Sequence, residues 1–262
     1  MSFFSSLFSK EERQKKVFEK NLKLVVDKNK QNDERYRAMQ YLKDLGSDEA
    51  IYGILRRFTI VAAGKGGTVV DEEEKQWAFK TILNFGERAL PSLEKFVLSK
   101  EGPAVNPVHS ISQALELIKT IKGNDKTYMK NLIKKLVADN PPGYERDPVR
   151  KEEILNFILD WDDSDMIDFV VEYLDDMNET IRFLTVECLF KYDNKEEIAR
   201  EPLLKLFKEE ESLRIRNRII QGFADKNWSI KGFKSYIEQH LDKAKYNIIK
   251  GDRIVPKKGA KK

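Results

Sequence analysis

The sequence contains few of the residues from which disulfides and metal sites are built. Its single cysteine, Cys188, excludes an internal disulfide, so a reducing compartment, the cytoplasm, is the simplest prediction for its localisation. Its two histidines, His109 and His240, lie far apart in the chain and outside any metal-ligand spacing of the H-E-x-x-H kind. The sequence therefore predicts no metal ion and no other cofactor.

Long apolar runs are absent as well. Residues 1–9 are apolar over far fewer than the ~20 positions that a membrane span requires, and they lack the apolar core and cleavage site of a signal peptide. We therefore predict no transmembrane segment. Four apolar residues of this stretch share one helical face ahead of several lysines: Phe3, Phe4, Leu7 and Phe8. This face has two interpretations, a cap over the first pair of helices or a weak contact with a membrane surface or a partner.

Catalytic motifs are missing too. The sequence has neither the G-x-S-x-G turn of hydrolases nor a dinucleotide-binding fingerprint. The glycines around Lys65 do not form a phosphate-binding loop, because that loop needs a glycine where this chain has Thr59. We therefore predict that the chain is not an enzyme.

What the sequence does contain is a helical pattern, which is clearest in residues 181–207. Its first half carries one apolar stripe at helical spacing: Ile181, Thr185, Val186, Leu189 and Phe190. Residues 193–195 interrupt the pattern, and Pro202 is predicted to open a second helix, at a position where its missing N–H costs nothing. Neither helix can bury its stripe alone, so the segment predicts a helical hairpin that stacks on similar hairpins.

Weaker copies of the first half recur along the chain. Aligned on Arg182, the copies begin at positions that are mostly basic and lie 32 to 40 residues apart: Arg35, Lys75, Ile111, Arg150 and Arg216. The positions four and seven residues further on are apolar in all six copies. Such a regular interval indicates a helical repeat protein.

The best copies also share an acidic residue. Asp176 precedes Arg182 by six residues, and Glu210 precedes Arg216 by the same distance. Together with the apolar columns, this pattern resembles the HEAT repeat over roughly residues 33–240. Stretches such as YERDPVRKEEILNF and EEESLRIRNRI are similar to bacterial HEAT-repeat proteins of unassigned activity. The resemblance implies a right-handed α-solenoid that binds proteins. It also implies a structural ladder in which each acid caps a turn and pairs with its arginine: Asp176 with Arg182, and Glu210 with Arg216.

The predicted fold is all-α, a right-handed α-α superhelix of about six helical hairpins. We expect residues 1–32 to form an N-terminal amphipathic or capping helix and residues 33–242 to form the repeats. Residues 243–262 are predicted to form a small β-hairpin with Gly251 in its turn, followed by a basic disordered tail.

Acidic charge gathers in residues 160–179, which hold nine acidic residues and no basic one. The simpler interpretation is a turn and helix N-terminus, where carboxylates cap amides and face the positive end of the helix dipole. The alternative is a salt-sensitive contact with a basic partner or a second copy, through these candidates: Asp162, Asp163, Asp165 and Asp168.

The preferred function is a scaffold that binds another protein, of unknown identity, on the concave face of the solenoid. That face is expected to carry the basic residues of the repeats: Arg35, Lys75, Arg150, Arg182 and Arg216. The alternative is a nucleic-acid-binding helical-repeat protein, which the basic ends and the pair Arg214 and Arg218, one helical turn apart, support. A net charge of only +4 favours the protein partner.

Overall fold

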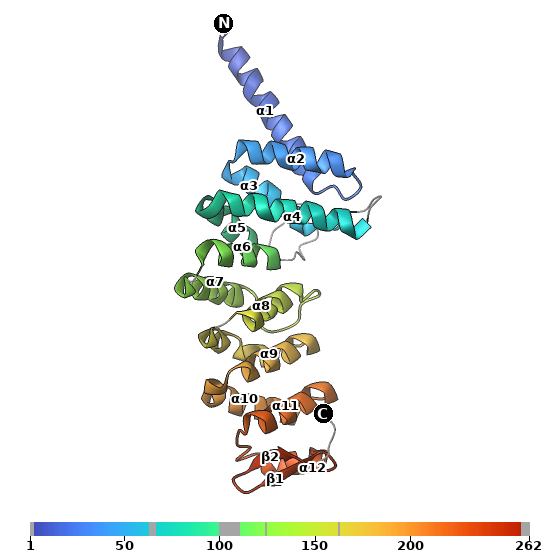
Figure 1. Cartoon of the computed structure of the whole chain (residues 1–262), viewed down its shortest axis with the longest axis vertical. Coiled ribbons are helices and arrows are strands. Elements are labelled where there is room, and N and C mark those ends of the chain that lie inside the picture. Colours follow the sequence, from blue (N-terminus) through green and yellow to red (C-terminus); the bar gives the residue numbers. More distant parts are fainter. Residues whose placement is uncertain (1–2, 63–66, 100–110, 124, 162, 258–262) are drawn as a thin grey trace. The chain divides into compact units, whose positions relative to one another are not determined.

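The computed structural model is predominantly helical, with twelve α-helices and one two-stranded sheet in the residues that it describes (Figure 1). The structure describes residues 3–62, 67–99, 111–123, 125–161 and 163–257. Of residues 3–9 and of residue 67 it describes the backbone alone. The prediction of a helical chain that ends in a small β-hairpin is therefore confirmed.

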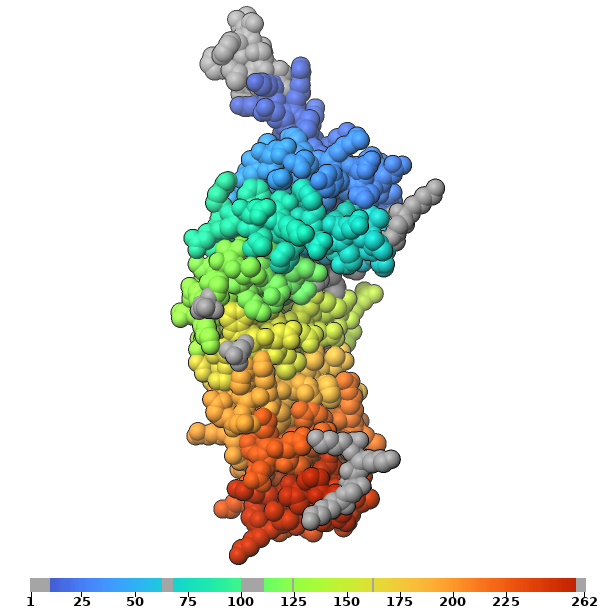
Figure 2. Space-filling view, viewed as in Figure 1, coloured from blue at the N-terminus to red at the C-terminus, as the bar shows by residue number. Residues whose placement is uncertain are grey.

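The chain divides into two units, unit 1 (Met1–Met129) and unit 2 (Lys130–Lys262). Within each unit, segments that are consecutive in the sequence occupy adjacent bands of the surface (Figure 2). Each unit therefore grows by packing each new helix on the one or two before it, as expected for stacked hairpins.

Unit 1 has two layers of helices. Its elements are α1 (Phe3–Val25), α2 (Asn32–Leu45), α3 (Asp48–Leu55), η1 (Arg56–Thr59), α4 (Gly67–Phe85), η2 (Gly86–Ala89), α5 (Leu90–Leu98) and α6 (Ser112–Lys122). Helices α2, α4 and α6 are neighbours in one layer, and α3 packs on α5 in the other. Helix α1 packs on both α2 and α3, whereas α7 (Lys126–Asp139) spans the division between the units.

A two-residue turn joins α2 to α3. Gly46 ends α2 with a positive φ of 58°, a conformation that favours glycine, and its N–H donates to the carbonyl of Leu42 at 3.1 Å. Ser47 then caps α3, because its hydroxyl accepts from the N–H of Ala50 at 3.2 Å. The short turn forces the two helices to lie against each other and fixes α3 as the inner wall of unit 1.

Helix α1 approaches α3 very closely at Gly53. A Cβ atom at this position would lie 2.4 Å from a methyl of Leu22 and 3.0 Å from a methyl of Leu42. Val25 is fully buried nearby, whereas the side chains of residues 10–17 are exposed, and this end of α1 extends beyond α2 (Figure 1). The side chains of the predicted apolar face, residues 3–8, lie outside the described part. Both interpretations of this face, a cap over the first helices and a contact with a membrane surface or a partner, therefore stay predictions.

Unit 2 is also two-layered. Its elements are α8 (Val149–Asp160), η3 (Ser164–Phe169), η4 (Val171–Asp175), α9 (Glu179–Lys191), η5 (Asp193–Lys195), α10 (Glu196–Glu209), α11 (Leu213–Lys226), α12 (Lys234–His240), β1 (Tyr246–Ile249) and β2 (Arg253–Pro256). Helices α8, α9 and α11 are successive neighbours, and α10 packs on η4 beside them. The antiparallel strands pair Tyr246 with Pro256 and Ile249 with Arg253, Gly251 lies in their turn as predicted, and β2 packs on α11.

The apolar stripe that the sequence predicts in residues 181–190 is buried on α9. Asn178 starts this helix, because its side chain accepts from the N–H of Thr180 at 2.8 Å. On α11, Gly222 faces the stripe so closely that a Cβ atom there would lie 2.3 Å from the ring of Phe190. The contact of α9 with α11 thus depends on a glycine at this position.

Two local predictions were wrong. Pro202 does not open a helix but lies inside α10, which begins at Glu196. A proline is tolerated here because only the carbonyl of Ile198 loses its helical partner, and Ile198 is 37% exposed. In the fourth repeat, two short 3-10 helices, η3 and η4, stand where the second helix of a hairpin was expected.

The substitution Gly222→Ala tests the close contact of α9 with α11. Alanine raises helix propensity by about 1 kcal/mol, but overpacking against a fixed ring costs about 1–3 kcal/mol, so we expect a net loss of stability. Urea unfolding of this variant should show the loss, whereas Gln221→Ala, an exposed neighbour on the same helix, should not. A gain of stability in Gly222→Ala would contradict the contact.

Candidate functional site

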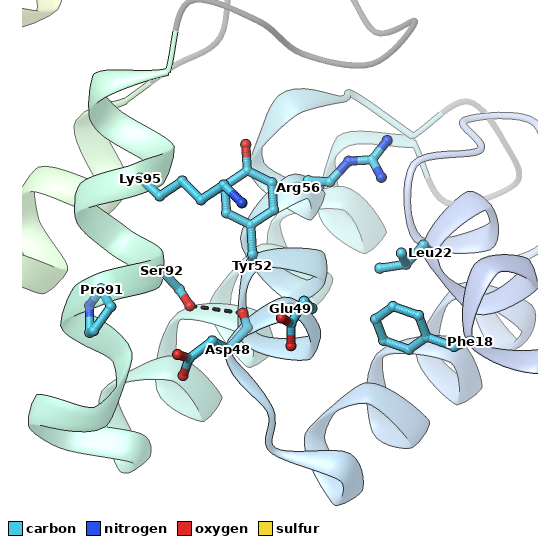
Figure 3. Close-up of a pocket in the computed structure, with 9 residues that line it drawn as sticks. All are labelled: Phe18, Leu22, Asp48, Glu49, Tyr52, Arg56, Pro91, Ser92 and Lys95. Atoms are coloured by element: carbon cyan, nitrogen blue, oxygen red, sulfur yellow. Dashed lines mark hydrogen bonds between the residues drawn. The ribbon is translucent and has the colours of Figure 1, made fainter. Parts of the chain in front are cut away.

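A pocket of about 470 Å³ opens in unit 1 between α1, α3 and α5 (Figure 3). The residues that line it are Phe18 and Leu22 of α1, Asp48, Glu49 and Tyr52 of α3, Arg56 of η1, and Pro91, Ser92 and Lys95 of α5. Its volume lies in the range of about 300–1,000 Å³ that is typical of ligand sites.

Helical spacing places these side chains together. Asp48 and Tyr52 are four residues apart, and Arg56 follows after four more, so the three lie on one face of α3 and its continuation into η1. Phe18 and Leu22 share a face of α1 for the same reason. Figure 3 shows α3 between α1 and α5, with the labelled side chains directed into the space that these helices enclose.

Helices α3 and α5 run parallel along this pocket. The hydroxyl of Ser92 donates to the carbonyl of Asp48 at 2.8 Å, and the ring of Tyr52 meets the ring of Phe96 edge to face at 6.1 Å. Both contacts join residues 44 positions apart, so the two helices stay in register. The acidic end of the pocket is therefore the N-terminal end of both helices.

Four charged side chains of the pocket make no ion pair with any residue that the structure describes: Asp48, Glu49, Arg56 and Lys95. Burial lowers the pKa of Arg56 below its ordinary value, because no carboxylate compensates for the lost water. The Nζ atom of Lys95 lies 5.1 Å from the ring centre of Tyr52, a cation–π contact. The pocket thus combines an acidic end, an aromatic middle and a basic end.

A second arrangement in unit 1 is a buried network of charges. Arg35 of α2 binds the carboxylate of Glu74 on α4 through Nε and Nη2, each at 2.9 Å. Arg57 of η1 donates to Glu74 and to Asp71 at 2.6 Å each, and Lys75 reaches Asp71 at 2.7 Å. Because Arg35, Arg57, Asp71 and Glu74 are all at most 3% exposed, the network is a structural clamp that holds α2 and η1 to α4.

The electrostatics of Asp71 show how the clamp tolerates burial. Burial by itself raises the pKa of this carboxyl group. Hydrogen bonds from Lys75, from the N–H of Ala62 and from Arg57 outweigh that effect, and the pKa lies below its ordinary value. The ionised form of Asp71 therefore stabilises the fold of unit 1.

Unit 2 repeats the contact between neighbouring helices. Lys151 of α8 binds the carboxylate of Asp176 at 2.8 Å, just before α9. Arg182 of α9 binds both oxygens of Glu210, at 2.7 and 2.9 Å, just before α11. Each acid also caps its own turn, Asp176 by accepting from the N–H of Asn178 and Glu210 by accepting from the N–H of Ser212. The caps agree with the ladder that the HEAT resemblance implies.

The pairing differs from the ladder that the resemblance implies. Of the groups of Asp176, Arg182 binds the backbone carbonyl, at 2.9 Å, and not the carboxylate, because the carboxylate of Asp176 already binds Lys151. In the described part of the chain Arg216 does not bind Glu210, because the oxygens of Glu210 accept from Arg182 and from the N–H of Ser212. Instead its guanidinium lies 4.9 Å from the ring centre of Phe207. Asp176 and Glu210 thus each pair with a cation of the preceding helix in the layer, Lys151 of α8 and Arg182 of α9.

These contacts remove the basic column from the candidates for an exposed binding face. Arg35 is 2% exposed and Arg150 is 9% exposed. Arg182 and Lys75 lie in ion pairs with most of their side chains covered. Arg35 and Arg182 turn inward because each one binds a carboxylate of another element, and Lys75 binds Asp71 of its own helix, so these three stabilise the fold rather than contact a partner.

The acidic candidates are also largely used within unit 2. Asp163 caps η3, because its carboxylate accepts from the N–H of Asp165 at 3.1 Å, and this is the simpler of the two interpretations. Lys195 binds Asp168 at 2.7 Å and lies 3.8 Å from Asp165, which also binds Lys130. A hydrogen bond to Asp165 raises the pKa of Lys130 above its ordinary value. Asp162 lies outside the described residues.

The two candidate arginines of the nucleic-acid alternative contact α9. Arg218 binds the carboxylate of Glu187, with Nη2 at 3.1 Å. The guanidinium of Arg214 stacks on the ring of Phe183 at 3.6 Å. Both side chains therefore stabilise the contact of α9 with α11, and only Arg214 is exposed.

The described residues contain no group of three or more His, Cys, Asp or Glu side chains that could hold a metal ion. Cys188 is buried, its thiol faces the carbonyl of Leu155 at 3.6 Å, and burial raises its pKa. None of the helices in the described ranges has the length and apolarity to cross a membrane. No family model, no curated protein and no solved structure matches the chain.

The sequence did not single out the pocket residues. Phe18, Tyr52 and Lys95 belong to three helices whose packing is not local in the sequence, so no spacing rule joins them. One signal was present, the order of acid, aromatic and base in Asp48, Tyr52 and Arg56, which marks a polar face on an otherwise apolar helix.

The pH dependence of stability tests the buried network. Because the folded pKa of Asp71 lies below its ordinary 3.8, its stabilisation is complete well above that pH and is lost as pH falls through the folded pKa. We expect Asp71→Asn to lower the stability of unit 1 at about pH 7 and to reduce its decline toward about pH 3. Hydrogen exchange of the α4 amides measures both effects. The exposed control Glu73→Gln should behave as the wild type, and an unchanged pH slope in Asp71→Asn would contradict the assignment.

Proposed function

We propose that this chain is a non-catalytic, cytoplasmic protein-binding scaffold that holds its partner at the pocket between α1, α3 and α5. The observation that carries the proposal is a pocket with an aromatic centre and four charged side chains that lack ion pairs in the described structure. Tyr and Arg are enriched among the residues that dominate protein interfaces, and both Tyr52 and Arg56 line this pocket. A free, buried Cys188 fits a reducing compartment.

We also propose that the hairpins stack as a right-handed superhelix similar to HEAT repeats. The support is the recurring contact in which a cation of one helix binds an acid of the next repeat: Arg35 with Glu74, Lys151 with Asp176, and Arg182 with Glu210. Glu74 lies inside α4, whereas Asp176 and Glu210 lie just before α9 and α11, so what recurs is the joining of neighbouring helices by an ion pair rather than the exact position of the acid.

Nucleic-acid binding is the alternative, and the geometry gives it less support. Of its two named arginines, Arg218 is neutralised by Glu187 and Arg214 is stacked on Phe183. Phosphate contacts need cations that are free to release counterions. The free charges of the pocket carry both signs, which suits a protein partner better than a polyanion.

A pull-down that compares the wild type with pocket variants tests the scaffold proposal. Proteins recovered by the tagged wild type are compared with those recovered by Tyr52→Ala and Arg56→Glu, and we expect both variants to lose the same partner by at least about tenfold. The matched control is Tyr144→Ala, which removes a tyrosine that is 79% exposed in unit 2 and should retain the partner. Circular dichroism confirms that each variant is folded. Equal recovery by all four proteins would contradict the proposal.

A further inference from the structure

The charges of the pocket follow a fixed order along α3. Asp48 and Glu49 lie in the first turn of the helix, and Arg56 lies just beyond its last residue. Glu49 and Arg56 are seven residues apart, which corresponds to about 10 Å along the helix axis. The acidic and basic ends are thus separated by about two helical turns.

The middle of the pocket is apolar and aromatic. Tyr52 lies between the charged ends, and Phe18 and Leu22 of α1 form the opposite wall (Figure 3). The position of that wall is fixed, because the methyl of Leu22 occupies the space that any Cβ atom at Gly53 would take. The α1 side of the middle is therefore apolar and suits an apolar side chain, while Lys95 lies over the other side, at the ring of Tyr52.

The basic end attracts an anion more strongly than an exposed arginine would. Arg56 is partly buried with no carboxylate among its described neighbours, and desolvation lowers its pKa. Lys95 is held over Tyr52 and adds a second positive charge from α5. A carboxylate that enters here would form charge-assisted hydrogen bonds and offset the cost of burying the guanidinium.

The unpaired charge at the basic end supports a ligand. The buried arginines Arg35 and Arg57 each bind a carboxylate of the chain itself, whereas Arg56, the partly buried neighbour of Arg57 in the sequence, binds none in the described structure. Asp48 and Glu49 are exposed in the first turn of α3, and the helix keeps them apart from Arg56. Complementary charges on a ligand would satisfy both ends at once.

We infer that the pocket binds an extended peptide segment of a partner protein in which a basic and an acidic residue flank apolar residues. The basic side chain would lie at Asp48 and Glu49, the apolar ones on Tyr52, and the carboxylate at Arg56. An extended chain advances about 3.3 Å per residue, so a gap of about 10 Å places the two charged residues three positions apart. A free amino acid is too short to span both ends. This inference rests on the proposed function, because it assumes that the pocket is the contact site.

Three synthetic peptides test the charge order. Fluorescence polarisation compares labelled dodecapeptides that differ only in a central Lys-Leu-Leu-Glu, Lys-Leu-Leu-Lys or Glu-Leu-Leu-Glu, each titrated with the full-length chain. We expect the wild type to bind the first peptide about tenfold more tightly than either of the others. Arg56→Glu should reverse the preference between the first two, because the new carboxylate repels glutamate and attracts lysine.

The outcomes separate the inference from the function on which it rests. Equal affinity for the three peptides, an unchanged preference in Arg56→Glu, or no saturable binding of the first peptide would overturn the charge order. If the partner is still lost from Tyr52→Ala in the recovery experiment, the pocket remains the contact site and only the charge order falls. A reversed preference in a folded Arg56→Glu protein supports the inference without any knowledge of the natural partner.

Discussion

An ion pair between a cation on one helix and an acid on, or just before, the next helix of the same layer is the contact on which the rest of this structure depends. In unit 1 Arg35 binds Glu74, and in unit 2 Arg182 binds Glu210, in both cases through two nitrogens and both carboxylate oxygens. Burying two charges is costly, so such a pair adds little net stability compared with apolar residues of the same shape. Its effect is on specificity, because each acid binds more than one element: Glu74 accepts from Arg35 of α2 and Arg57 of η1, and Glu210 accepts from Arg182 of α9 and from the N–H of Ser212. The pair thereby sets which helices are neighbours.

The same network in unit 1 shapes the candidate site. Arg57 is fully buried between Glu74 and Asp71, which fixes η1 against α4. The next residue back along the chain is Arg56, which is thereby held at the basic end of the pocket. A structural cation and a free cation thus stand side by side in the sequence, and the clamped one sets the position of the free one. Gly53 contributes in a similar way, because the space at its Cα lets Leu22 of α1 close the opposite wall.

The sequence was sufficient for the features that are encoded locally. The apolar stripe of α9 and the terminal hairpin with Gly251 in its turn were predicted correctly, because helical spacing and turn chemistry act over a few residues. The prediction from Pro202 was wrong, because an exposed helical carbonyl that lacks its N–H donor can accept a hydrogen bond from water instead. The pocket was not predictable, because it is formed by three helices whose contacts are not local in the sequence. The ladder was predicted to pair each acid with the arginine six residues later, because spacing alone does not show that Arg182 binds Glu210. The basic residues that recur every 32 to 40 residues were expected on a binding surface, but Arg35 and Arg150 are buried, and Lys75 and Arg182 are partly buried in ion pairs.

A double-mutant cycle on Arg182 and Glu210 tests most directly whether these pairs join successive repeats. The variants Arg182→Met, Glu210→Leu and the double variant are compared with the wild type by hydrogen exchange of the α9 and α11 amides, which reports the stability of unit 2. Because Arg182→Met leaves the buried Glu210 without its partner, we expect it to cost about 3 kcal/mol, and we expect Glu210→Leu to cost about 2 kcal/mol because Arg182, 19% exposed, keeps its backbone partners. The double variant should recover much of that loss, with a coupling energy of about 2 kcal/mol. Losses that add to within about 0.5 kcal/mol would show that the two side chains act independently and would contradict the account.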